Sequence, residues 1–135
     1  MVKLADFTTL RRCSTSRDER RVEAAGASNV GFLVTSTNGD SSGPVTITYT
    51  DGSTTTATLE VSDWAGGPAA DENTAATMPY RNSIGGSSQQ LTVSVFEISV
   101  PVDAAKTVAS VTLPNVGFQV GSGRTGMHIF AIGTG

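Results

Sequence analysis

The residues best suited to chemistry lie around the single tryptophan of the chain. Trp64 ends the stretch TYTDGSTTTATLEVSDW, and Tyr80, Arg81 and Asn82 follow within the next segment. Flat apolar rings can stack on the C–H faces of sugars while polar neighbours bind the hydroxyls. If the intervening segment folds back, these four residues form a carbohydrate-binding surface. The alternative is that Trp64 covers one end of the core, which is the commoner role of a tryptophan after a strand.

A second set of residues has the donor atoms for a divalent metal ion. His128 is the only histidine and could act as a ligand or a general base. Asp63, Asp71 and Glu72 lie in expected turns or loops, where carboxylates suit calcium. A single histidine needs such carboxylates, or a second chain, to complete a tetrahedral zinc site. The alternative is an ordinary strand histidine beside turn acids, with Asp63 capping a turn and pairing with Arg81.

The elements that must position these residues have the period-two pattern of β-strands. Asp51-Gly52 separates two alternating runs and predicts a two-residue hairpin turn. In LTVSVFEISV (residues 91–100) the apolar phase switches, which predicts a bulge or burial on both faces. Further strands are expected at TVASVTL, VGFQV and MHIFAI. The apolar residues that share a face in the first three strands are Val30, Phe32 and Val34, then Val45, Ile47 and Tyr49, then Ala57, Leu59 and Val61.

These short strands, with turn signals between them, predict an antiparallel β-sandwich of jelly-roll type. Residues 25–135 are expected to form this one domain, with residues 63–90 as its longest loop. Residues 1–24 differ in charge: they hold six basic and four acidic residues, against three and eight in the rest. The run RDERRVEAA (residues 17–25), with Ser16 and Glu19 as a capping box, predicts a short, loosely docked helix or a tail. Such an abrupt change also fits a segment of separate origin from the sandwich.

Composition limits the classes of partner. The net charge of −3 gives no basic footprint, so we expect no nucleic-acid partner. The apolar runs are too short to span a membrane, so no membrane partner is expected either. The N-terminus has no continuous apolar stretch, and we expect no signal peptide in this chain.

Several ordered motifs together resemble a known family. They are TYTDGSTTTATLEVSDW, MPYRNS, VSVFEISVPVDAAKTVASVTLPN and MHIFAIG. This series is similar to the ancillary β-sandwich modules of secreted actinobacterial glycoside hydrolases of the alpha-mannosidase type, over roughly residues 28–133. The resemblance implies a non-catalytic module that binds or positions carbohydrate, and a parent protein that is secreted. Modules of that family carry further strands before the equivalent of NVGFLVTSTNGD, so the chain resembles an N-terminally truncated copy.

Two functions from different classes follow. The leading hypothesis is a non-catalytic module that binds an oligosaccharide, and a divalent metal ion is the one cofactor that the residues leave open. The alternative is a small metal-dependent hydrolase of phosphoester-type substrates, which arose when such a module was truncated and dimerised, with His128 as its catalytic group. Because missing front strands would leave a bare sheet edge, we expect a homodimer, with residues 1–13 available to cross to the partner.

Overall fold

The computed structural model describes residues 3–4, 18–115 and 123–135. Within these ranges the regular elements are all β-strands, and the strands are joined by turns and short irregular segments. The strands are β1 Lys3–Leu4, β2 Glu19–Ala25, β3 Asn29–Thr37, β4 Ser41–Tyr49, β5 Thr54–Val61, β6 Glu72–Met78, β7 Arg81–Asn82, β8 Ser88–Gln89, β9 Val93–Pro101, β10 Thr107–Thr112 and β11 Gly126–Thr134.

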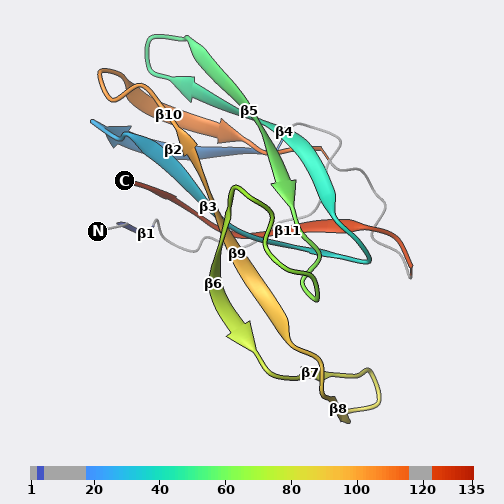
Figure 1. Cartoon of the computed structure of the whole chain (residues 1–135). Coiled ribbons are helices and arrows are strands. Elements are labelled where there is room, and N and C mark those ends of the chain that lie inside the picture. The colour runs from blue at the N-terminus through green and yellow to red at the C-terminus, as the bar shows by residue number, and fades with distance from the viewer. Residues whose placement is uncertain (1–2, 5–17, 116–122) are drawn as a thin grey trace.

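Two antiparallel sheets pack against each other (Figure 1). One sheet has the order β1-β11-β3-β9-β6 and the other the order β2-β10-β4-β5, while β7 and β8 form a separate hairpin. Non-consecutive neighbours such as β3 and β9 show that the chain crosses repeatedly between the sheets. The predicted antiparallel β-sandwich is therefore confirmed. No helix in the described ranges has the length and apolar character needed to cross a membrane.

The core lies between the sheets and is built from the alternating positions identified in the sequence. Phe32 and Phe96 are its largest fully buried side chains, and they come from neighbouring strands of the larger sheet. Burial of this apolar surface is the main stabilising contribution in such a sandwich. The remaining core residues are Val30, Val34, Val45, Ile47, Tyr49, Leu59, Val61, Ile98, Val100, Val108 and Val111.

The helix expected in residues 17–25 is wrong, because residues 19–25 form strand β2. This strand pairs antiparallel with β10, so that Arg21 lies opposite Ser110 and Ala25 opposite Thr107. Val22 and Ala24 pack against the core, while Glu19, Arg21 and Glu23 are exposed on the other face. Pairing with β10 and burial of alternate residues outweigh the local helix signals. The sheet thus continues across the domain boundary expected at residue 24.

The turn at Asp51-Gly52 has three residues rather than the predicted two. The amide of Tyr49 donates to the carbonyl of Ser53 (2.9 Å), and the amide of Gly52 donates to the carbonyl of Tyr49 (3.0 Å). Gly52 has a φ of 83°, and Asp51 is not among the non-glycine residues with positive φ. A two-residue type I′ turn needs positive φ at both central residues, whereas a three-residue loop needs it only at its last. Gly52, the last residue of this loop, therefore has the positive φ that the turn requires.

Residues 63–90 are not one long loop, because they contain strands β6, β7 and β8. β6 pairs with β9 at the edge of the larger sheet, and all its residues after Glu72 are exposed. The register of this pair shifts between Thr74 and Ala76, opposite Phe96 and Val95. A bulge is therefore present beside the phase switch, but its extra residue, Ala75, lies on β6 and not within residues 91–100 as predicted. The strand expected at residues 116–120 lies outside the described residues.

Candidate functional site

Trp64 is held where two strands of the larger sheet separate. β3 and β9 pair as far as Val34 and Phe96. Beyond that point residues 62–64 lie between them: Ser36 donates its amide to the carbonyl of Ser62 (3.0 Å), and its own carbonyl accepts from the amide of Trp64 (2.7 Å). The carbonyl of Trp64 in turn accepts from the amide of Ser94 of β9 (2.7 Å). The backbone of Trp64 is therefore fixed from both sides.

The carboxylate of Asp63 is used by the backbone around this junction. Its Oδ2 accepts from the amide of Gly39 (2.8 Å) and its Oδ1 from the amide of Ala65 (2.9 Å). The amide of Asp63 donates to Oδ1 of Asp40 (2.8 Å). Asp63 thus caps the turn that carries Trp64, as one of the two sequence interpretations expected. The expected pair between Asp63 and Arg81 is not among the ion pairs of the described residues.

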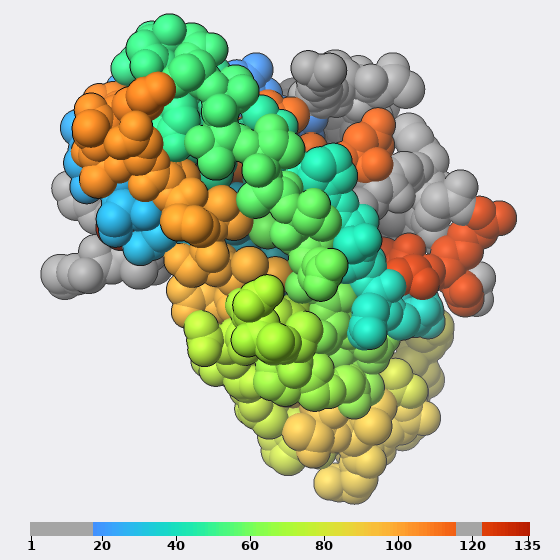
Figure 2. All heavy atoms as spheres, turned by 45° about the horizontal axis from the view of Figure 1, so that its top comes forward, coloured from blue at the N-terminus to red at the C-terminus, as the bar shows by residue number. Residues whose placement is uncertain are grey.

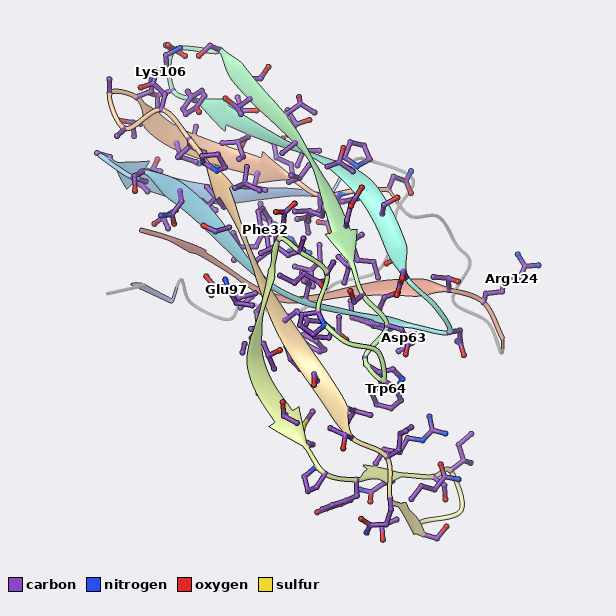
Figure 3. All side chains as sticks on the ribbon, in the orientation of Figure 1. Phe32, Asp63, Trp64, Glu97, Lys106 and Arg124 are labelled. Atoms are coloured by element: carbon purple, nitrogen blue, oxygen red, sulfur yellow. The ribbon has the colours of Figure 1, made fainter. Side chains whose placement is uncertain are left out.

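Arg81 instead lies against the ring of Trp64. Its guanidinium carbon is 5.5 Å from the ring centroid, a distance typical of a cation–π contact. Its Nε donates to Oε1 of Gln89 across the β7–β8 hairpin (2.8 Å). Figure 3 shows Trp64 on the side of the sandwich from which this hairpin extends. The contact joins the turn after β5 to the hairpin after β6, so the segment does fold back to bring Arg81 to Trp64.

Tyr80 and Asn82 flank Arg81 and are both exposed. Successive side chains alternate between the two faces of a hairpin, so Asn82 lies on the face opposite to that of Arg81 and Gln89, while Tyr80 precedes β7. Tyr80 has a relative exposure of 50%, and Ile84 at the tip of the hairpin is fully exposed. Figure 2 shows the yellow residues of this region as a projection from the body of the molecule. Of the predicted set of four, Trp64 and Arg81 are therefore in contact, while Tyr80 and Asn82 are exposed residues on either side of Arg81 in the chain.

The four predicted metal ligands are not brought together. Nε2 of His128 is hydrogen-bonded to Oγ1 of Thr37 (3.1 Å) on β3, and Asp71 is exposed at the start of β6. Across the described parts of the chain, no group of three or more histidine, cysteine or acidic residues is arranged to hold a metal ion. The assignment of Glu72 as a ligand also conflicts with the bonds that its carboxylate makes.

Glu72 is a buried carboxylate with a relative exposure of 7%. Its Oε1 accepts from the amide of Ser62 (2.9 Å) and its Oε2 from the amide of Ala69 (2.8 Å). A carboxylate that accepts two backbone hydrogen bonds can be buried without a metal or an arginine partner. Glu72 therefore closes the segment between β5 and β6 and supports the turn that presents Trp64. Sequence reasoning missed this role, although an acid at the start of a long acid-free stretch is a usable signal.

The chain was compared with known protein families and with curated proteins. No family model matches it, and no curated protein matches it.

Proposed function

We propose that this chain is a non-catalytic carbohydrate-binding module, derived from a secreted bacterial glycoside hydrolase. The observation that supports it best is the contact of Arg81 with Trp64. It places a partly exposed ring beside guanidinium donors at one end of a rigid sandwich. An exposed ring with a few fixed polar groups is the arrangement that orients a saccharide.

The neighbouring residues add to this surface. Tyr80, next to Arg81 in the chain, supplies a second exposed ring. On the other face of the hairpin, Asn82 supplies an amide that can both donate to and accept from hydroxyls. Because Arg81 covers part of one face of Trp64, sugar stacking is expected on the remaining exposed part of that ring and on Tyr80. No comparable observation supports the hydrolase alternative, because the described residues include no group of three or more histidine, cysteine or acidic side chains that could hold a metal ion.

Fluorescence of the single tryptophan provides a direct test. Titration with linear mannooligosaccharides should shift the emission of Trp64, and calorimetry should give the same dissociation constant. Tyr80→Ala should weaken binding without lowering Tm, because the side chain is half exposed. Phe130→Ala is the matched control: this aromatic has nearly the same exposure, 48%, but lies on β11. A folded wild-type protein that responds to no saccharide in a broad panel would refute the proposal.

A further inference from the structure

Arg81 is the only charged residue in a long stretch of the chain. Residues 73–96 contain no aspartate or glutamate and no other cation. This stretch includes most of β6, the β7–β8 hairpin and the first part of β9. The whole chain has a net charge of −3, so an acid-free region with one arginine is a local exception. Such a region favours the approach of an anion.

The guanidinium of Arg81 is oriented but only partly used. Its Nε is bonded to Gln89, and its guanidinium carbon lies over the ring of Trp64. Neither of its terminal nitrogens has an acceptor among the described residues. By contrast, Arg20 pairs with Asp18 (3.0 Å) and Lys106 with Asp51 (3.2 Å). The acid nearest to Trp64 in sequence, Asp63, has both oxygens bonded to backbone amides.

A fixed guanidinium with two free amino groups matches an oxyanion with two oxygens in a plane. We infer that the saccharide bound at this end of the sandwich carries an anionic group, a carboxylate or a phosphate, which pairs with the terminal nitrogens of Arg81. The sugar ring then packs on the exposed rings while the oxyanion sets its orientation. This inference rests on the proposed carbohydrate-binding function and narrows it to acidic saccharides.

The test compares three ligands under the same conditions: a neutral mannotriose, a trimannuronate and mannose 6-phosphate. Trp64 fluorescence and calorimetry give the dissociation constants at low salt and at 0.5 M NaCl. We expect at least one anionic ligand to bind about tenfold more tightly than mannotriose, since a charge-assisted bidentate pair contributes on this scale. The preference should fall at high salt, because the charges are partly exposed. The carboxylate and phosphate arms identify which oxyanion is recognised.

The variants separate charge from shape. Arg81→Gln should remove the preference for the anion while leaving mannotriose binding, and Arg81→Lys should retain only part of it, because lysine lacks the planar fork. Arg124→Gln is the matched control: this arginine is exposed, and its side chain points outward from the molecule in Figure 3. Melting curves of all variants show whether the hairpin is intact.

Three results would overturn the inference. Equal affinity for neutral and anionic ligands, or a preference that survives in Arg81→Gln, would refute it while leaving the proposed function in place. Absence of binding to all three ligands and to every other saccharide would refute both.

Discussion

Nζ of Lys106 lies 3.2 Å from Oδ2 of Asp51, and this pair joins two turns at the end of the sandwich opposite the β7–β8 hairpin (Figures 1 and 3). The same ammonium group donates to Oγ of Ser53 (2.7 Å) and lies 5.3 Å from the centroid of the Tyr49 ring. The β4–β5 turn and the turn before β10 are therefore held together by one lysine.

The carboxylate of Asp51 should make stability depend on pH below pH 4. The hydroxyl and amide of Ser53, with a further contribution from Lys106, lower the pKa of Asp51 from 3.8 to about 2. Because the folded pKa is the lower one, its stabilisation is present above pH 4 and is lost as the pH falls towards 2. Asp51→Asn should therefore lower Tm at pH 6, and its difference from wild type should narrow between pH 4 and pH 2.

Asp71→Asn is the control for this pH dependence. Asp71 follows β5 in the chain, whereas Asp51 precedes it, and Asp71 is exposed and makes no hydrogen bond among the described residues. Melting curves across the pH range measure both variants. A constant difference between Asp51→Asn and wild type from pH 6 to pH 2 would contradict the assignment.

Substitution of Gly52 should lower the free energy of unfolding through backbone conformation alone. A Cβ at Gly52 would meet no atom within 4 Å, but its φ of 83° is unfavourable for residues with a side chain. We expect Gly52→Ala to lower the free energy of unfolding by about 1–2 kcal/mol. Gly67→Ala is the matched control, since Gly67 also has open space but lacks a positive φ. Urea denaturation measures both, and equal effects of the two substitutions would argue against the turn geometry.

Glu72→Gln should destabilise the protein although it preserves side-chain shape. One of the two backbone amides, Ser62 or Ala69, would then face an amide group instead of a carboxylate oxygen. The expected loss is about 1–3 kcal/mol in the free energy of unfolding. Glu60→Gln, at an exposed site on β5, should change it by less than about 0.5 kcal/mol. If both variants unfold at the same urea concentration, Glu72 does not hold this segment.

The homodimer remains a prediction, but its structural premise has changed. β1 pairs with β11 and β2 pairs with β10, so residues 3–4 and 19–25 extend the sheets of their own chain. Among the longer edge strands, β6 is charged only at its first residue, Glu72, whereas β2 has four charged residues. Charges discourage pairing between edge strands. We therefore expect two copies to associate through β6.

Thr77→Lys should then shift the protein to a monomer, because it places a charge on β6. Thr58→Lys on the β5 edge is the matched control and should leave the dimer intact, since both threonines are exposed edge-strand residues. Light scattering coupled to size exclusion measures the mass. A wild-type mass of 13.9 kDa at all concentrations would exclude the dimer.

The sandwich was predictable because its core strands are buried on one face, which imposes a period of two on residues such as Val30, Phe32 and Val34. β2 was mistaken for a helix because charged residues lie on both of its faces and only two apolar side chains, Val22 and Ala24, pack against the core. β6 was missed for a different reason: exposure on both faces leaves no alternation to detect. The contact between Arg81 and Trp64 depends on how β6 and the hairpin after it fold, so the sequence indicated its members but not their pairing.

The position of Trp64 between β3 and β9 also has a consequence for the order of folding. Ser36 and Ser94, which bond its backbone, are far from it in the sequence and belong to strands that must already be in place. The β4–β5 hairpin can form from local contacts, whereas this junction must close long loops. During refolding, the emission of Trp64 should therefore report the late closure of the larger sheet, after circular dichroism has already recorded the early strands.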